Sequence, residues 1–143
     1  MTTTVGAVEE ILTVLQAVSG WTVFEGEPVD PPREETEDDA LGPVLPYCCL
    51  YMGGGMTRAT RHGGRPVDLS LGWQITYAAG TPRGALWAFD KGRAALVGLR
   101  LFDGLQHGQV KEAIDAGEVR RDKEVPNDIR WYVPMRYRIA TTT

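Results

Sequence analysis

The chain has 143 residues, of which 43% are hydrophobic and 24% are charged, and its formal net charge is −4. These values are typical of one globular domain, and no apolar run reaches the roughly 18 residues of a membrane-spanning helix, which argues against a membrane protein. The two cysteines are neighbours and cannot cross-link distant segments, and Glu9 and Glu10 interrupt any signal-like apolar start. We therefore expect a protein made in the cytoplasm.

The charge is distributed unevenly along the chain. Residues 1–45 contain ten acids and one base, Arg33, which gives −9, whereas residues 46–143 contain nine acids and fourteen bases, which gives +5. Such a separation of acidic and basic residues indicates how a protein meets its partners and stays soluble, but it does not indicate the fold. It indicates either two surfaces that meet oppositely charged partners or a solvated acidic loop.

The first third of the chain predicts a helix, a short strand and a loop. Apolar residues recur every three or four positions over residues 5–18, as on one face of a helix, and Gly20 follows where a helix commonly ends. The sequence WTVFEG at 21–26 then favours a strand. Residues 26–43 are rich in proline and acid, which predicts a flexible acidic loop.

The middle of the chain predicts two strands joined by a basic loop. Residues 44–52, VLPYCCLYM, are apolar at successive positions, as in a strand covered on both faces. A glycine- and arginine-rich loop is expected at 53–66. Strict alternation of apolar and polar residues over 67–79 then predicts a long, half-buried strand.

A second helix is predicted over residues 81–98. Thr81 can cap it, Pro82 suits the first helical position, and Gly98 suits the end. Small residues on one side would let the helix approach a sheet. Trp87 and Lys91 lie on the other side, so we expect Trp87 to be exposed and to form an interface, the alternative being a tryptophan covered by loop residues or by Arg83.

The last third predicts two strands. A short one is expected at QVKEAI, residues 109–114, followed by a charged turn at 120–128. Alternation over residues 129–139 predicts a strand with one apolar and one basic face, at or near a sheet edge because Pro134 cannot donate a backbone hydrogen bond. The fold class is therefore α+β: a single domain over 1–143, with two helices on a mainly antiparallel sheet in the order α-β-β-β-α-β-β.

Patterns that would support catalysis or cofactor binding are weak. Adjacent Cys48 and Cys49 would point to opposite faces of a strand and could not bind one zinc ion, and His62 and His107 have no nearby ligand-type partner. The glycine-rich loop joins two strands and contains no lysine, unlike a phosphate-binding loop. We expect no metal, no cofactor and no enzymatic activity.

Nucleic-acid binding is an open alternative. Arg58, Arg61 and Arg65 recur every three or four residues in the basic loop, together with His62, and phosphate attracts such a loop without regard to sequence. No helix-turn-helix, zinc finger or aromatic platform accompanies them. The other interpretation is a solvated loop or one that docks on a protein partner.

The order and texture of these segments resemble a known family. The segments LPYCCLYMGGG, DLSLGWQITYAAGTPRGALWAFDKGRAALVGLRL and VPNDIRWYVPMRYRIATT are similar to the tail terminator, or tail-completion, proteins of long-tailed (siphovirus) bacteriophages, especially those of actinobacterial hosts. The likeness covers most of the chain except the acidic loop. It includes no catalytic signature, and neck and head-completion proteins share the α+β build.

The resemblance implies a structural virion protein. Members of the family form a ring, expected here to be a hexamer, on the head-proximal end of the tail; the ring stops tube polymerisation and provides the head-tail joining surface. The implied partners are further copies of the chain, the major tail-tube protein and a connector or neck protein, while DNA passes through the lumen without specific recognition. Candidate contact residues fall into two groups: Arg58, His62, Arg61 and Arg65 in the assembly loop, and Trp87, Lys91, Arg136 and Arg138 on an intersubunit surface.

Overall fold

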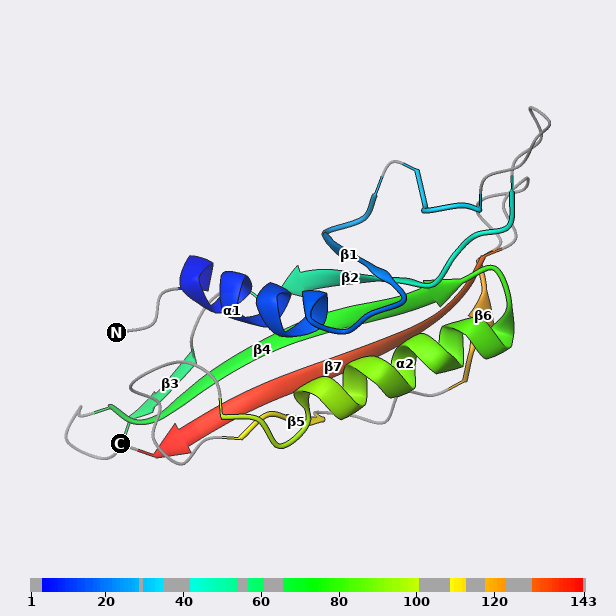
Figure 1. Cartoon of the computed structure of the whole chain (residues 1–143). Helices are drawn as coiled ribbons and strands as arrows, with labels where there is room; N and C mark the ends of the chain where they lie inside the picture. The colour runs from blue at the N-terminus through cyan, green and yellow to red at the C-terminus, as the bar shows by residue number, and fades with distance from the viewer. Residues whose placement is uncertain are drawn as a thin grey trace.

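Two helices lie on one face of a twisted seven-stranded sheet (Figure 1). The computed structural model describes residues 4–28, 30–34, 42–53, 57–60, 66–100, 109–112, 118–122 and 130–142. Its elements are α1 (Thr4–Gln16), β1 (Thr22–Glu25), β2 (Tyr47–Met52), β3 (Thr57–Thr60), β4 (Pro66–Ala79), α2 (Pro82–Leu96), β5 (Lys111–Glu112), β6 (Arg120–Arg121) and β7 (Trp131–Thr142).

The sheet is mainly antiparallel, as the sequence predicts. Its strand order is β1-β2-β4-β7-β5, with β3 beside β4 and β6 beside β7. Only the pairing of β1 with β2 is parallel among the described strands. The acidic segment that follows β1 therefore begins at one edge of the sheet, and the basic strand β7 lies next to the other edge.

Strands β4 and β7 form the long axis of the domain. They pair without interruption from Asp68 opposite Thr142 to Ala79 opposite Trp131. On its other side β7 pairs with β5 at residues 137–138 and with β6 at residues 131–132. Pro134 falls between these two short pairings, where no described strand lies beside β7, so the expectation that its strand is near an edge is confirmed.

The structure contains two strands that the sequence did not predict. Residues 57–60, expected to be part of a loop, form β3, which pairs with β4 and has an irregular register between Ala59 and Thr60. Residues 120–121, expected to lie in a charged turn, form β6. Both segments are short and polar, and their pairing comes from a long neighbouring strand with unsatisfied backbone groups rather than from their own side-chain pattern.

The second helix follows its predicted punctuation. The side chain of Thr81 accepts a hydrogen bond from the backbone N–H of Gly84 at 3.0 Å, and Pro82 is the first residue of α2. Gly98 has a φ of +88°, a conformation that favours glycine where a helix ends. Buried Ala85, Ala88 and Gly92 place α2 directly on β4 and β7.

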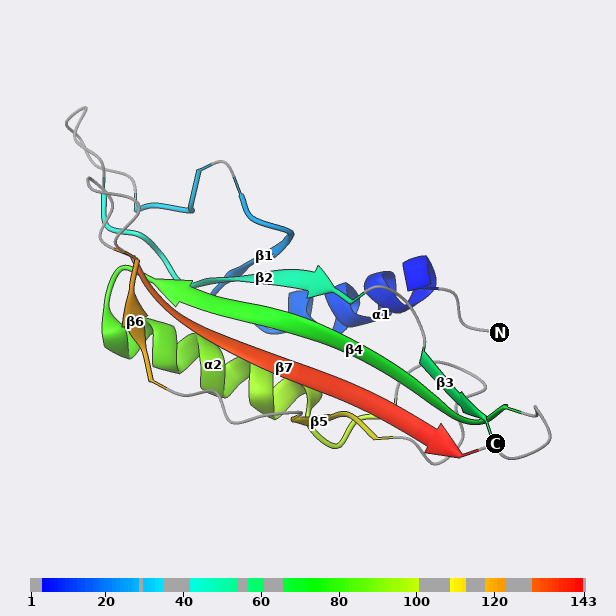
Figure 2. The same ribbon diagram turned by 180° about the vertical axis from the view of Figure 1, so that it is seen from behind.

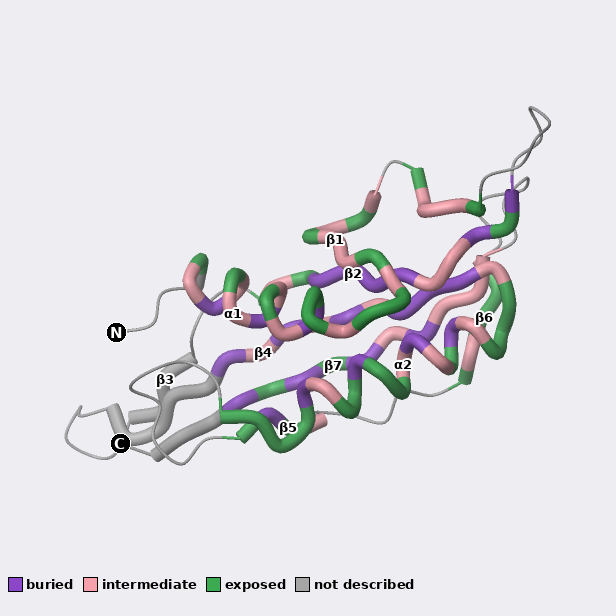
Figure 3. The backbone as a smooth tube through the Cα atoms, viewed as in Figure 1, coloured by how far each residue is buried: buried purple, intermediate pink, exposed green. Residues whose placement is uncertain are grey.

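The two faces of the sheet differ in what covers them. Seen from behind, the strands lie in front of both helices (Figure 2). The helix-covered face holds most of the core, including Ile11 of α1, Ile75 of β4 and Met135 of β7. Figure 3 shows buried positions along both helices and along β2, β4 and β7. The other face, here called the helix-free face, holds a smaller cluster of Val44, Tyr47, Cys49 and Ala78. Strand β2 is thus buried on both sides, as its continuous apolar sequence predicts.

Candidate functional site

The two cysteines lie on opposite faces of the sheet, as predicted. Cys48 is opposite Tyr77 and belongs to the helix-covered core, whereas Cys49 is opposite Thr76 on the helix-free face. Burial raises the pKa of the Cys49 thiol to about 12, and burial raises that of Cys48 further still. Both thiols stay protonated at neutral pH, a state that suits packing rather than nucleophilic attack or metal binding.

No group of three or more potential metal ligands converges within the part of the chain that the structure describes. His62, His107, Arg61 and Arg65 lie outside the described residues, so their predicted roles remain predictions. Arg58 lies on β3 opposite Leu69, and its side chain also lies outside the description.

A buried arginine organises one end of the helix-free face. The side chain of Arg130, directly before β7, is only 12% exposed. Its guanidinium donates hydrogen bonds to the carboxylate of Asp122, to the hydroxyl of Tyr47 at 3.0 Å and to the carboxylate of Glu27 at 3.4 Å. These four residues are called the Arg130 network below.

Electrostatics explains why the network tolerates burial. Burial alone lowers the pKa of Arg130, but the hydrogen bonds to Asp122 and Tyr47 raise it more, so the guanidinium stays charged. Burial also raises the pKa of Tyr47, against the opposing effect of Arg130. Three segments distant in sequence thus converge on one cation, and the end of β7 is fixed to β2 and to the residues that follow β1.

A hollow of about 420 Å³ lies beside the network on the helix-free face. It is lined by the four residues of the network and by Cys49, Tyr51, Thr76, Ala78, Arg121 and Tyr132. The guanidinium is already engaged and the thiol is protonated, so these groups provide no evident general base or nucleophile. Tyrosine side chains on a concave surface instead suit contact with another protein.

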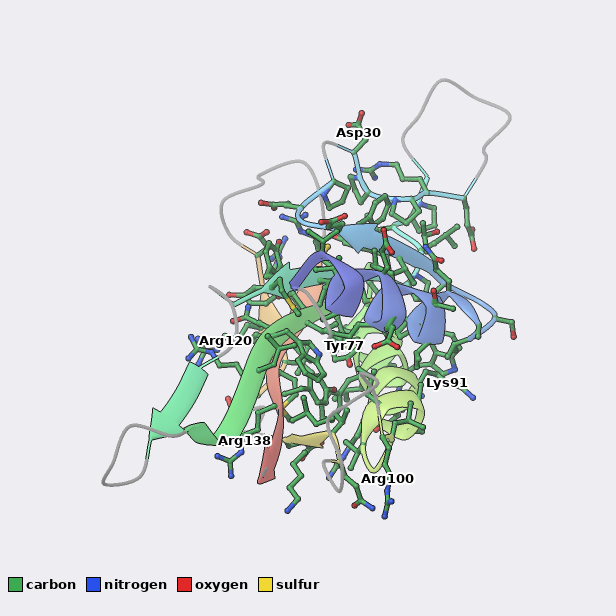
Figure 4. All side chains as sticks on the ribbon, turned by 90° about the vertical axis from the view of Figure 1, so that its left-hand side faces the viewer. Asp30, Tyr77, Lys91, Arg100, Arg120 and Arg138 are labelled. Atoms are coloured by element: carbon green, nitrogen blue, oxygen red, sulfur yellow. The ribbon has the colours of Figure 1, made fainter. Side chains whose placement is uncertain are left out.

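The predicted intersubunit residues are divided between the two sides of the sheet. Arg136 and Arg138 are exposed and lie opposite Gln74 and Gly72 on the helix-free face. Lys91 is exposed on α2, on the helix-covered side (Figure 4). Figure 4 shows the labelled Arg120 and Arg138 across the sheet from Lys91. The structure therefore does not bring the four predicted residues into one patch.

The expected exposure of Trp87 is wrong. Trp87 is half-buried and packs against the helix-covered core, with its ring edge-to-face to Trp21 at a centroid distance of 6.4 Å. It also lies over Gly20, while the Lys91 ammonium is 5.8 Å from the ring centroid. The side of α2 that carries Trp87 faces the turn after α1, so the alternative of a tryptophan covered by loop residues is correct.

Searches against models of known protein families and against curated protein sequences find no match. Among the described helices, none is both long enough and apolar enough to cross a bilayer. The observations that bear on function are therefore the helix-free face, its hollow and the exposed arginines of β7.

Sequence reasoning missed the Arg130 network. Arg130 was visible only as one of several basic residues in an alternating strand, and nothing local distinguishes it from Arg136 or Arg138. Its partners Glu27 and Tyr47 are 103 and 83 positions away. Such a site can be found only once the strand order is known.

Proposed function

We propose that this chain is a tail terminator protein of a long-tailed bacteriophage: a structural protein that forms a ring on the head-proximal end of the tail tube, stops tube growth and provides the surface for head-tail joining. The proposal rests on the segments that resemble that family and on one structural observation. That observation is a sheet with both described helices on one face and a helix-free face that displays tyrosines and arginines.

The helix-free face suits assembly better than chemistry. In its hollow the guanidinium of Arg130 is paired, the thiol of Cys49 is held in the protonated state, and Arg121 adds an exposed cation. Its exposed groups include Tyr51, which is 38% exposed, and Arg136 and Arg138 of β7. Tyrosine and arginine are the residue types most enriched at the energetically important centres of protein interfaces.

The implied partners are further copies of the chain in the ring, the major tail-tube protein below it and a connector or neck protein above it. No cofactor is required, and DNA would pass through the lumen without specific recognition. A neck or head-completion protein would share the α+β build and an assembly surface. What separates the two roles is the partner on which the ring forms, and this can be measured.

The test is tube capping. Purified protein is mixed with polymerising tail-tube protein of the same phage, and tube lengths are measured by electron microscopy. Wild-type protein is expected to shorten tubes and to appear as a ring at one end, while a heat-denatured sample has no effect. Unchanged tube lengths at molar excess would contradict the proposal and would favour a neck or head-completion role if the protein binds a connector instead.

A further inference from the structure

Three cations form a group on the helix-free face, at the edge of the sheet formed by β5. Lys111 of β5 lies directly opposite Arg138 of β7, and Arg136 lies two residues along the same face of β7. All three side chains are exposed. We call Lys111, Arg136 and Arg138 the basic trio.

The basic trio is unfavourable within one molecule. Like charges directly opposite each other on neighbouring strands destabilise a sheet, and Lys111 and Arg138 are such a pair. Their neighbours on β4 are Gly72 and Gln74, which carry no charge. No ion pair joins the trio to any acid in the described part of the chain.

The nearest described carboxylate along β5 serves another cation. Glu112 follows Lys111 and therefore points to the opposite face of the sheet, where its Oε1 lies 2.7 Å from Nε of Arg93. Among the residues that the structure describes, a local rule of sheet pairing is thus broken without local compensation. Such departures are expected where a surface is shaped for a partner, in this case a partner with negative charge.

The same chain holds a surface of the complementary sign. Residues 25–34, which the structure describes apart from residue 29, carry a charge of −3 and are called the acidic segment here; they hold four acids, Glu25, Glu27, Asp30 and Glu34, against Arg33 alone. Those that the structure describes and leaves exposed include Glu25, Asp30 and Glu34. The Arg33 guanidinium donates to the carbonyl of Gly42 at 3.0 Å, so part of its hydrogen-bonding capacity is used within this segment.

The acidic segment and the basic trio belong to opposite edges of the sheet. The acidic segment follows β1, and the trio lies on β7 and β5, with β2 and β4 between them. Figure 4 shows Asp30 and Arg138 on opposite sides of the molecule. Glu27 of the acidic segment contacts Arg130 at the start of β7, but Arg136 lies six residues further along the strand, roughly 20 Å away at about 3.3 Å per residue. This exceeds the Debye length of about 8 Å at physiological salt, so the two surfaces hardly neutralise each other in one molecule.

We propose that the basic trio of one subunit docks on the acidic segment after β1 of the next copy, so that subunits join head to tail. Two different surfaces on opposite edges make a contact that is not self-complementary, and such contacts close into rings when the rotation between subunits allows it. The inference rests on the proposed function, since it names the contact between neighbours in the ring.

A second copy fits better than a nucleic acid. The whole chain has a net charge of −4, and its acidic segment would repel phosphate groups that approached the β1 edge. Beside the trio, the described helix-free face offers Gly72 and Gln74 of β4 and one exposed ring, Tyr51 opposite Gln74, rather than a series of aromatic rings on which successive bases could stack. Another copy supplies a matching acidic surface at equal concentration.

The experiment is a charge exchange between two variants. One variant reverses the trio, R136E/R138E, and the other reverses described acids, D30K/E34K. R136E/R138E changes the charge of the trio from +3 to −1, and D30K/E34K changes the charge of residues 25–34 from −3 to +1. In each variant alone, both contacting surfaces therefore have the same sign. In an equimolar mixture, each surface of one variant meets the opposite sign on the other, and subunits can alternate.

Self-association is measured by sedimentation velocity and chemical cross-linking at high protein concentration and low salt, and then on tail tubes. We expect each variant alone to associate at least tenfold more weakly than wild type, and the equimolar mixture to recover association. The matched control is R83E/R100E, which changes the charge equally at exposed arginines away from the helix-free face and should behave as wild type. Circular dichroism melts check that every variant is folded.

The possible outcomes separate the two proposals. If R136E/R138E associates and caps tubes like wild type, the docking proposal is overturned and the terminator proposal stands. If the mixture recovers association but wild type never caps tubes, the docking contact stands and the terminator proposal is overturned. A wild type that stays monomeric both alone and on tubes contradicts the docking proposal. A last outcome is that wild type binds duplex DNA, that R136E/R138E loses this binding, and that the mixture does not recover self-association. This outcome would assign the trio to nucleic acid and would also overturn the docking proposal.

Discussion

The hydroxyl oxygens of Tyr77 and Tyr137 lie 2.7 Å apart in the core between the sheet and the helices. Both side chains are almost completely buried, and burial raises the pKa of both phenols. Trp21 stacks on Tyr77 and Trp73 stacks on Tyr137, with ring centroids about 6 Å apart in each pair. The one polar pair at this position is thus enclosed by aromatic rings from β4, β7 and the residue before β1.

Removing one hydroxyl of this pair is expected to cost more than removing both. Tyr77→Phe or Tyr137→Phe alone leaves the other hydroxyl buried without that partner, which should lower the free energy of unfolding by about 1–3 kcal/mol. The double variant removes both polar groups and should cost clearly less than the sum of the single changes. Urea denaturation of the four proteins measures this difference, and strictly additive effects would show that the hydrogen bond contributes nothing.

Gly92 of α2 is required by a close approach to the core. A Cβ at this position would collide with Cε1 of Tyr77, on a fully buried ring that cannot easily move. Helix propensity alone would make Gly92→Ala stabilising by about 1 kcal/mol, but overpacking of a filled core costs about 1–3 kcal/mol. We expect the steric effect to dominate and Gly92→Ala to lower the thermal midpoint.

An exposed position on the same helix provides the control for that prediction. Ala94 is exposed, so Ala94→Gly tests propensity without packing and should cost about 1 kcal/mol. Thermal unfolding of both variants followed by circular dichroism gives the comparison. A Gly92→Ala protein more stable than wild type would mean that α2 can move away from β4.

The elements with strong periodicity were predictable from the sequence. The alternation in residues 67–79 depends only on the strand burying one face, and the capping residues Thr81 and Pro82 act locally. The buried β2 was likewise indicated by its continuous apolar run, and the structure shows both of its cysteines covered. In each case the residues that determine the element lie within one short segment of the sequence.

The features that were missed depend on contacts between segments. Strand β3 forms because β4 extends beyond β2, which no property of residues 57–60 reveals. Trp87 is covered by Trp21, which is distant in sequence and comes close only because both helices share one face. The pairing of Lys111 opposite Arg138 was invisible for the same reason, since it depends on strand register.

Alkaline pH should destabilise the protein through its buried thiols. Cys49 has a pKa of about 12 in the folded protein, against an ordinary value near 9, so the unfolded chain loses its proton first as the pH rises. The contribution is fully present below about pH 9 and is lost progressively up to about pH 12. Each pH unit in this window removes about 1.4 kcal/mol per thiol.

This pH dependence can be assigned with a variant. Cys49→Ala removes one titrating group, so its free energy of unfolding should fall less steeply than that of wild type between pH 9 and pH 11, while the two proteins show parallel behaviour between pH 6 and pH 8. Urea denaturation at each pH provides the measurement. An equally steep alkaline decline in Cys49→Ala would show that the buried tyrosines, rather than this thiol, dominate the effect.

Arg130 should not be replaceable by lysine. Its separate nitrogens contact Asp122, Tyr47 and Glu27, and a lysine ammonium has neither the planar shape nor the reach to serve all three acceptors at once. Arg130→Lys is expected to lower the free energy of unfolding by about 1–3 kcal/mol, because it leaves poorly paired polar groups at a position that is only 12% exposed.

The matched control is Arg121→Lys, because Arg121 is exposed on the neighbouring strand β6 and forms no ion pair with another described residue. It should change stability by less than about 0.5 kcal/mol. Urea unfolding compares the two, and proteolysis provides an independent measure, since loosening of the start of β7 should expose the segments that meet there. If Arg130→Lys were as stable and as protease-resistant as Arg121→Lys, the three-way contact would not fix this end of the sheet.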